Sequence, residues 1–293
     1  MNDNIVVGID IGGSHIAAAL VNLEDRMLLP NSYTRKEVNS SGTAEEIIAE
    51  WSQVVKDVVK DCSDSSLRLG IAMPGPFNYE DGISLIKNQN KFDLLYKLNI
   101  RELLGKELLI KNENIRFMND AGCFLQGEAF CGAARTYSSA IGLTLGTGLG
   151  SSRYMNGVAQ DADLWNTPFK DGIAEDYLST RWFVNRCYDL YGRMVEGVKE
   201  LVDLVEKLPV AKSIFEEFGE NLGQFLAYFI QLDKPEAVIL GGNIAKSHPL
   251  FLPSLINYLD SSAVQVTIKL AELGEEAALI GAVSCWSESN VTI

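Results

Sequence analysis

An Asn-Asp pair, Asn119 and Asp120, is the first candidate for proton-transfer chemistry in this chain. The pair follows the strand-like residues FM and precedes a run with helical spacing, so we expect it at a strand-to-helix corner. Such corners line the mouths of clefts in α/β proteins, where a carboxylate can accept a proton. The alternative is that one of the two residues only caps the helix, which both residue types do well.

A candidate phosphate site lies in residues 4–22, NIVVGIDIGGSHIAAALVN, which predict a strand, a glycine turn and a returning strand. Gly12 and Gly13 allow a tight turn that a phosphate group can approach closely. Asp10 precedes the turn within an apolar strand, where a carboxylate is costly unless a metal ion, water or a ligand meets it. We therefore interpret Asp10 as a candidate anchor for a metal ion or water.

The same pattern occurs a second time, because residues 6–14, VVGIDIGGS, align without a gap to residues 140–148, AIGLTLGTG. The aligned pairs include Gly8 with Gly142, Asp10 with Thr144 and Gly12 with Gly146. In the second copy, Thr147 and Gly148 offer hydroxyl and amide donors. Two such turns facing one another would hold a polyphosphate from both sides.

Two further stretches are candidate binding loops. Gly241, Gly242 and Asn243 follow the apolar strand AVIL, and an adenine or ribose could approach the backbone there. The alternative is a tight strand-to-helix turn. The loop SLIKNQNKFD carries Asn88 and Asn90, whose amides suit hydroxyl recognition but equally suit any exposed loop.

With 293 residues, the chain is long enough for one large domain or for two domains that share a cleft, and the repeat favours two; the predicted strands and helices are those of an α/β protein. A capping box of Thr43 and Glu46 predicts the start of the first helix. The NYEDG segment predicts a hairpin, and Asn156 with Gly157 predicts a second one. Further helices are predicted over 100–107, 175–190, 197–207, 210–231 and 275–286, and further strands over 68–73, 115–118, 237–240 and 264–271.

Composition narrows the classes of function. The formal net charge of −14 over 293 residues argues against a partner that is bound through a nucleic-acid backbone. The N-terminus has neither a basic signal region nor an apolar run long enough for a membrane helix, so we expect a cytoplasmic protein without a membrane partner. Five scattered cysteines suggest reduced thiols, and neither His15 nor His248 lies beside a cysteine, so no zinc site is expected.

These stretches together resemble the ROK (repressor, open reading frame, kinase) family of sugar kinases, glucokinase-like members of the actin-like ATPase superfamily, over essentially the whole chain. The residues that carry the resemblance are Asp10 to Ser14, Pro74-Gly75-Pro76, Asn119-Asp120 with Gly127-Glu128, Gly146 to Gly148 with Gly150, Glu175 in AEDYLS, and Gly241-Gly242-Asn243. The resemblance implies a two-lobed, ribonuclease H-like fold with duplicated mixed-sheet domains and an interlobe cleft. The expected lobes are residues 1–117 plus 276–293 and residues 118–275.

The resemblance also implies the roles of the site residues. The expected reaction is a hexokinase- or glucokinase-type transfer of phosphoryl from ATP, with Asp120 as the base that deprotonates a hydroxyl of a hexose or amino sugar. Asp10 would act on Mg²⁺ through water. The sugar would be bound by Asn88, Asn90, Asn119, Asp163, Asn166 and Glu175. The nucleotide would be bound by Asp10, Gly12, Gly13, Ser14, His15, Gly146, Thr147, Gly148, Gly241, Gly242 and Asn243.

One segment departs from the family pattern. Where the family has Glu-x-Gly-His, this chain has Asp163-Leu164-Trp165-Asn166, and the cysteine-rich zinc segment that normally follows is absent. Asp163 reaches one methylene less far than a glutamate, and Asn166 keeps a hydrogen-bonding group without a titratable ring. The sequence therefore leaves the identity of the sugar and of its reacting hydroxyl open.

Two other functions remain as alternatives to a kinase. The first is a catalytically weak sugar sensor or regulator that keeps the fold, without a DNA-binding domain because the first strand begins near Asn4. The second is a chaperone-type ATPase of the same superfamily, which the chain is too short to match. The apolar helices over 175–231 make a homodimer compatible with the sequence without establishing one.

Overall fold

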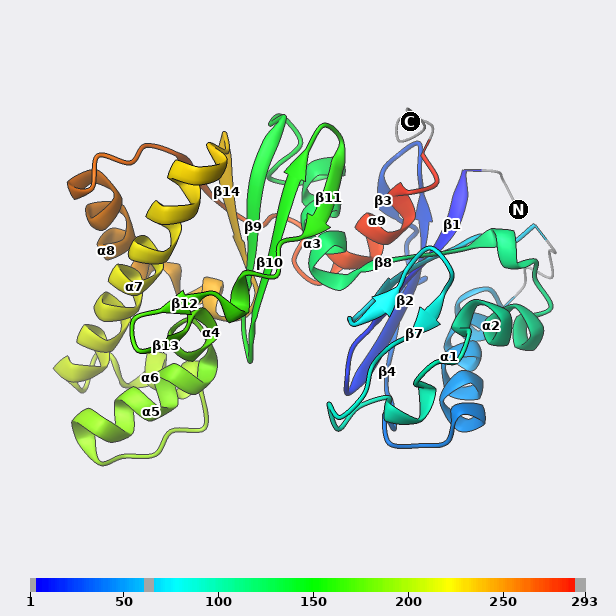
Figure 1. The fold of residues 1–293 in the computed structure, drawn as a ribbon, viewed down its shortest axis with the longest axis horizontal. Coiled ribbons are helices and arrows are strands. Elements are labelled where there is room, and N and C mark those ends of the chain that lie inside the picture. Colours follow the sequence, from blue (N-terminus) through cyan, green and yellow to red (C-terminus); the bar gives the residue numbers. More distant parts are fainter. Residues whose placement is uncertain (1–3, 61–65, 288–293) are drawn as a thin grey trace. The chain divides into compact units, whose positions relative to one another are not determined.

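The two glycine-turn hairpins predicted from the repeat are both present, and each supplies the first two strands, in chain order, of one sheet (Figure 1). The first consists of β1 (Ile5–Ile11) and β2 (His15–Asn22), and the second of β9 (Ser139–Leu145) and β10 (Leu149–Met155). The computed structural model describes residues 4–60 and 66–287. The chain divides into a first unit, Met1–Thr136 with Tyr154–Asp161 and Glu272–Ile293, and a second unit, Tyr137–Arg153 with Ala162–Ala271.

The first unit is built on a six-stranded mixed sheet with the order β3-β2-β1-β5-β8, in which β4 also pairs with β2. β1 runs antiparallel to β2 and parallel to β5, and β5 runs parallel to β8. Every residue of β5 is buried, as expected for a central strand that is covered on both faces. The other strands are β3 (Met27–Leu28), β4 (Thr34–Glu37), β5 (Leu69–Met73) and β8 (Ile115–Asn119).

Helix α1 (Ala44–Val58) begins at the predicted capping box, which the structure confirms. The Thr43 hydroxyl accepts the Glu46 N–H at 3.3 Å, and the Glu46 carboxylate accepts the Thr43 N–H at 2.8 Å. The apolar face of α1, including the fully buried Trp51, packs into the core of the first unit. The smaller elements here are the hairpin β6 (Phe77–Asn78) and β7 (Ile83–Ser84), η1 (Asp93–Leu95), α2 (Ile100–Leu108) and η2 (Asn112–Asn114).

Helices α3 (Asp120–Cys131) and α9 (Glu276–Ser284) lie side by side in the first unit, although they are far apart in the sequence (Figure 1). Their backbones touch through glycines. A Cβ atom on Gly281 would lie 1.8 Å from the Cys123 carbonyl oxygen, and one on Gly127 would lie 2.1 Å from the Ala277 carbonyl oxygen. Only glycine permits this approach, so the small-residue face predicted for the last helix is a packing face against α3.

A single buried carboxylate ties the end of α3 to the segment before α9. Glu128 is fully buried, and its Oε2 accepts the N–H groups of Ala133 at 2.7 Å and Glu272 at 3.1 Å. Its Oε1 accepts the N–H of Leu273 at 2.9 Å. All four residues belong to the first unit.

These contacts draw the units differently from the expected lobes. The expectation divided the chain at 117/118 and at 275/276, whereas the first unit extends through α3 to residue 136, includes residues 154–161 and continues from residue 272. The physical reason is that α3 packs on α9, and Glu128 binds the backbone of residues 272–273.

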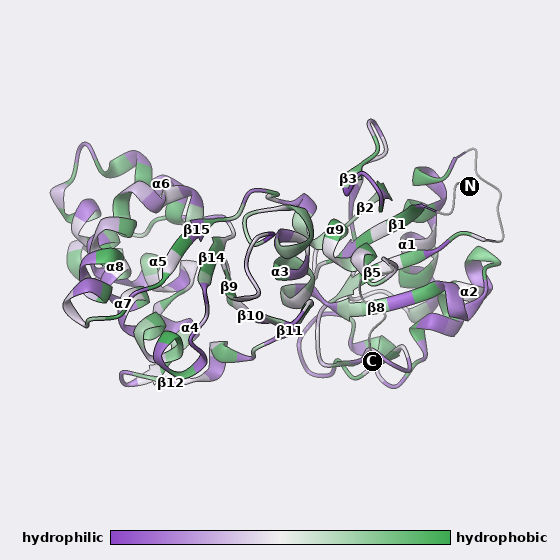
Figure 2. Cartoon of the chain, turned by 90° about the horizontal axis from the view of Figure 1, so that it is seen from above, coloured by the Kyte–Doolittle hydropathy of each residue, from purple (hydrophilic) through white to green (hydrophobic). Residues whose placement is uncertain are grey.

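The second sheet has the order β11-β10-β9-β14-β15, in which β14 runs parallel to both β9 and β15. The strand predicted from AVIL is β14, which is buried throughout and drawn mostly green in Figure 2. Strand β11 (Val158–Asp161) belongs to the first unit, and the second unit contains β12 (Pro168–Phe169), β13 (Gly172–Ile173), β14 (Ala237–Gly241) and β15 (Thr267–Leu270).

The helix predicted over 175–190 is instead two helices, α4 (Ala174–Tyr177) and α5 (Thr180–Tyr191). The break has a specific cause, since the Thr180 N–H donates to the Gly146 carbonyl oxygen at 2.8 Å instead of continuing α4. The remaining helices are η3 (Leu164–Asn166), α6 (Val198–Leu204), α7 (Pro209–Asp233), η4 (Ile244–Ser247) and α8 (His248–Ser261), the last of which was not predicted.

Four of the five cysteines, Cys123, Cys131, Cys187 and Cys285, are free thiols. The fifth, Cys62, lies outside the described residues. In the described part of the chain, no helix has the length and apolar character needed to cross a membrane.

Candidate functional site

The first glycine turn closes on its own backbone, because the Gly12 N–H donates to the His15 carbonyl oxygen at 2.8 Å. Neither Gly12 nor Gly13 has a positive φ, so their small size rather than an unusual backbone angle is what the turn uses. Ser14 is exposed, and its hydroxyl lies 2.8 Å from Nδ1 of the half-buried His15. The five residues assigned to this turn from the sequence therefore lie together at one end of β1 and β2.

Asp10 is the penultimate residue of β1, half-buried between Ala17 on β2 and Ala72 on β5. Burial, reinforced by the negative charge of Asp120, raises the pKa of Asp10 from 3.8 to about 6. Within residues 4–60 and 66–287, its carboxylate accepts no hydrogen bond. A carboxylate left in this state fits a hydrated Mg²⁺ ion, because the cation and its waters would supply the missing charge and donors.

Asp10→Asn is expected to stabilise the protein at high pH. The folded-state pKa lies above the unfolded value, so Asp10 destabilises the fold as the pH rises from about 4 to about 6 and above. Replacing the acid should raise the free energy of unfolding by about 1–2 kcal/mol at pH 8, after allowing for partial exposure, and by nothing at pH 3.5. Urea titrations in EDTA at both pH values measure this, and equal stability of the two proteins at pH 8 would contradict it.

The Asn119-Asp120 corner forms as predicted, with Asn119 ending β8 and Asp120 beginning α3. The capping role falls to Asn119, whose Oδ1 accepts the Gly122 N–H at 3.0 Å. The Asp120 carboxylate accepts the N–H of its neighbour Ala121 at 2.9 Å, and its side chain remains accessible to solvent. Asn119 therefore takes the capping role that the sequence left open, and the Asp120 carboxylate stays accessible to solvent.

The Asp120 carboxyl group reaches solvent but is surrounded by protein atoms. This partial loss of hydration raises its pKa above the ordinary value, while the Ala121 N–H and the charge of Lys91 act in the opposite direction. A base with a raised pKa holds a transferred proton more firmly than an ordinary aspartate does. Asp10 and Asp120 also act on one another, since the Asp120 charge contributes to the raised pKa of Asp10.

Tyr79 is a residue of this corner that sequence reasoning missed. Its hydroxyl donates to the Met73 carbonyl oxygen at 3.1 Å and accepts from Nδ2 of Asn119 at 3.2 Å. Burial raises the pKa of Tyr79, so the phenol stays protonated and keeps both bonds. The signal in the sequence was weak, because Tyr79 lies in the NYEDG hairpin, 40 residues before the group that it orients.

The amide loop places Asn88 and Asn90 on the surface of the first unit, both exposed and both with left-handed backbone (φ of 59° and 57°). Asparagine tolerates this conformation better than most residues do. The left-handed backbone therefore favours asparagine at positions 88 and 90, whether or not the side chains of Asn88 and Asn90 also contact a sugar.

The second glycine turn, residues 146–148, is held by the start of α5 and by α4. The Thr180 hydroxyl and N–H both donate to the Gly146 carbonyl oxygen, at 2.9 and 2.8 Å. Oε2 of Glu175 accepts the Leu149 N–H at 3.0 Å and would lie 2.7 Å from a Cβ on Gly148. Thr147 is exposed at the tip. Glu175, which was expected at the sugar, thus supports the second glycine turn.

The Gly241-Gly242-Asn243 stretch lies against the strand that leads into this turn. Gly242 has a φ of +85°, and a Cβ there would lie 2.4 Å from the Leu145 carbonyl oxygen, so no other residue fits without strain. Asn243 is exposed and accepts from Lys246 at 2.8 Å. β9 and β14 are parallel, so both glycine stretches lie at the carboxyl ends of neighbouring strands, where α/β proteins bind ligands.

The segment in which the sequence departs from the family pattern is exposed. Asp163 has a left-handed backbone (φ 51°) and accepts the indole N–H of Trp165 at 2.5 Å. Trp165 is 42% exposed, and Asn166 is exposed at the end of η3. The indole therefore holds the shorter Asp163 carboxylate in one orientation.

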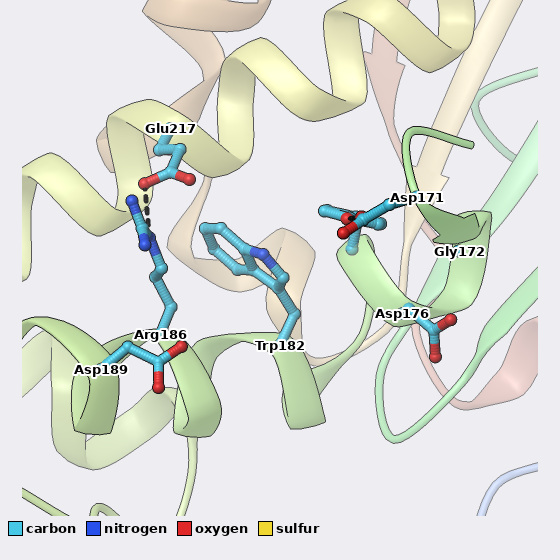
Figure 3. Close-up of a pocket in the computed structure, with 8 residues that line it drawn as sticks. Asp171, Gly172, Asp176, Trp182, Arg186, Asp189 and Glu217 are labelled. Carbon is cyan, nitrogen blue, oxygen red and sulfur yellow. Dashed lines mark hydrogen bonds and ion pairs between the residues drawn. The ribbon is translucent and has the colours of Figure 1, made fainter.

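A hollow of about 510 Å³ in the second unit is separate from these residues (Figure 3). Its arginine, Arg186, is paired with Glu217 at 2.8 Å. The other charged residues that line it are Asp171, Asp176 and Asp189. With this excess of carboxylates, the hollow is unsuited to the phosphates of a nucleotide. Over residues 4–60 and 66–287, no three His, Cys, Asp or Glu side chains are grouped to hold a metal ion directly.

Comparison with known proteins identifies a shared fold and the family of this chain. A ROK family glucokinase from Streptomyces griseus, solved with glucose and AMPPNP, matches with a TM-score of 0.74 at 22% identity, over 95% of this chain and 97% of that one. The fold is therefore the α/β fold of the actin-like ATPases, as predicted.

Two curated relatives are similar in sequence. An N-acetyl-D-glucosamine kinase from Mannheimia succiniciproducens is 27% identical over 314 residues, covering 95% of this chain and 98% of the kinase. A xylose repressor from Bacillus subtilis is 26% identical over 270 residues, covering 87% of this chain and 68% of the repressor. The sequence pattern of the ROK family matches residues 6–162 and 170–289, and the chain belongs to that family.

Proposed function

We propose that the protein is an ATP-dependent sugar kinase of the hexokinase or glucokinase type, acting on a hexose or an amino sugar. The observation that carries this proposal lies at the start of α3. There Asn119 caps the helix, and the Asp120 carboxylate remains accessible to solvent. Similarity to an N-acetyl-D-glucosamine kinase over nearly the whole chain supports the same class of reaction.

In this reaction a sugar hydroxyl attacks the γ-phosphorus of ATP. The new bond joins the sugar oxygen to phosphorus as the bond from phosphorus to the ADP oxygen breaks, and the hydroxyl proton passes to Asp120. The raised pKa of Asp120 suits this role, and Asn119 fixes the start of α3 so that the carboxylate keeps its position.

The phosphates are assigned to the two glycine turns, and the adenosine to the stretch after β14. In the first unit these residues are Asp10, Gly12, Gly13, Ser14 and His15. In the second unit they are Gly146, Thr147, Gly148, Gly241, Gly242 and Asn243. Asp10 would hold Mg²⁺ through water, and the ion would neutralise negative charge on the phosphates.

The sugar is assigned to Asn88, Asn90, Asn119, Asp163, Asn166 and Glu175. Oδ1 of Asn119 already accepts the Gly122 N–H, so this residue would offer a sugar its remaining Nδ2 hydrogen. Glu175 binds the Leu149 N–H through Oε2, and its Oε1, which pairs with Arg181 at 3.7 Å, would also accept a sugar hydroxyl. Asp163 is the shorter carboxylate that Trp165 orients.

A second candidate function is a sugar-responsive sensor with little turnover. Two observations favour it: the similarity to a xylose repressor, and the Asp163 to Asn166 segment that replaces the family's Glu-x-Gly-His. A sensor would bind a sugar without releasing ADP.

A coupled ADP-release screen separates the two functions. The sugars are glucose, mannose, fructose, allose, xylose, N-acetylglucosamine, N-acetylgalactosamine and N-acetylmannosamine, each with Mg-ATP. Release that depends on one sugar supports the kinase. Silence on all of them, with calorimetric binding of one sugar, supports the sensor and contradicts the proposed activity.

A further inference from the structure

Lys91 lies in the loop of residues 84–93 in the first unit, which also carries Asn88 and Asn90. It is not among the site residues predicted from the sequence. The next residue, Phe92, anchors the loop. Phe92 is fully buried, its ring meets that of Trp51 edge to face at 5.2 Å, and its N–H donates to the Ser40 carbonyl oxygen at 2.7 Å. The backbone of Lys91 is therefore fixed by the hydrophobic core on one side.

The backbone of this loop is unusual on both sides of Lys91. Asn88, Asn90 and Phe92 have φ values of 59°, 57° and 56°. A left-handed conformation is uncommon and strained for a bulky aromatic residue. Such backbone strain is found preferentially at functional sites, where it fixes the direction of a neighbouring side chain.

The side chain of Lys91 lies on the first glycine turn. Its Cδ is 3.2 Å from the position that a Cβ on Gly13 would take, so the missing side chain at Gly13 makes room for it. Lys91 is half-buried, and within residues 4–60 and 66–287 its ammonium group forms no ion pair and lies over no aromatic ring. Its positive charge acts on Asp120 and lowers the pKa of that residue.

The negative charges near the first glycine turn oppose the binding of phosphate, so a positive charge is needed there. Asp10 and Asp120 both lie close enough to interact, and two carboxylates repel the phosphates that the turn is proposed to bind. The protein as a whole, at −14, adds to this repulsion. An ammonium group whose stem lies against Gly13 and which has no ion-pair partner among the described residues can offset this repulsion locally.

We propose that Lys91 is a catalytic residue that binds an oxygen of the transferred phosphoryl group, between the first glycine turn and Asp120. This inference rests on the proposed kinase function and adds to it a residue that the family motifs do not contain. As the bond from phosphorus to ADP breaks and the bond to the sugar forms, charge spreads over the equatorial phosphoryl oxygens, and the ammonium group stabilises it there.

Lys91→Met tests the proposal in the 293-residue protein, because methionine keeps a side chain of similar length against Gly13 and removes the charge. We expect kcat to fall about 30- to 300-fold and KM for ATP to rise, with KM for the sugar within about 2-fold of the wild-type value. Lys91→Arg should restore part of kcat. Lys87→Met is the matched control, since Lys87 is exposed in the same loop and lies over the Tyr96 ring at 5.0 Å. An unchanged kcat, or a defect confined to KM for the sugar, would overturn the proposal.

A binding measurement separates this inference from the kinase proposal. Calorimetry with Mg-AMPPNP should show about 10-fold weaker binding to Lys91→Met than to the wild-type protein or to Lys87→Met. Such a loss supports Lys91 even if no sugar is phosphorylated, in which case only the kinase proposal fails. Equal affinity of all three proteins, or no binding to any of them, contradicts the role of Lys91. Matching thermal unfolding curves would establish that the variants fold.

Discussion

Asp120→Asn is expected to lower kcat about 100- to 10,000-fold on whichever sugar the screen identifies, with KM for that sugar changed by less than about 3-fold. The amide oxygen can still accept the Ala121 N–H, and Asn119 still caps α3, so the fold of the corner is kept. What is lost is a group that can take the proton from the attacking hydroxyl. Initial rates over a range of sugar and ATP concentrations measure the effect.

The control for this variant is Asp81→Asn, which removes an exposed carboxylate from the turn between β6 and β7 in the same unit. Its kcat should equal that of the wild-type protein. Near-normal turnover of Asp120→Asn would show that the proton leaves by another route and would end the assignment of Asp120 as the base. Because the pKa of Asp120 is raised, the wild-type rate should fall on acidification at a higher pH than for an ordinary aspartate.

Glu128→Ala is expected to lower the free energy of unfolding of the first unit by about 3 kcal/mol or more. The substitution leaves three backbone N–H groups, those of Ala133, Glu272 and Leu273, without their acceptor, and it opens a cavity at a fully buried position. Urea unfolding followed by circular dichroism measures the change in midpoint and slope.

Two comparisons make the Glu128 result specific. Glu128→Gln keeps one acceptor oxygen and should lose roughly half as much stability. Glu113→Ala removes an exposed glutamate, with its side chain 71% accessible, and should change the stability by less than about 0.5 kcal/mol. A loss below about 1 kcal/mol for Glu128→Ala would mean that the junction between α3 and residues 272–273 does not depend on this carboxylate.

The sequence was sufficient for features that depend on neighbouring residues. The capping box of Thr43 and Glu46 spans one helical turn, and both of its hydrogen bonds are present. The two glycine-turn hairpins follow from apolar alternation around a glycine pair, and they form in both copies of the repeat. The corner at Asn119 and Asp120 follows from the change of period from strand to helix.

Features that depend on residues far apart in the sequence could not be predicted from it. The break between α4 and α5 exists because Thr180 binds Gly146, 34 residues earlier. Tyr79 orients Asn119 from a separate hairpin, and Lys91 reaches Gly13 across the unit. No local pattern encodes these pairings, because each arises only when the sheet brings its strand ends together.

The packing of α9 also has a consequence for synthesis of the chain. α9 covers β1 and β5 through glycines, since a Cβ on Gly8 would lie 2.6 Å from the Leu279 carbonyl oxygen and one on Gly70 would lie 2.3 Å from that of Ala282. The strands that open the chain therefore leave the ribosome long before the helix that covers them. Until translation reaches residue 284, the first unit exposes an apolar sheet face and one flank of α3, which makes this interval the time when the nascent protein most needs a chaperone.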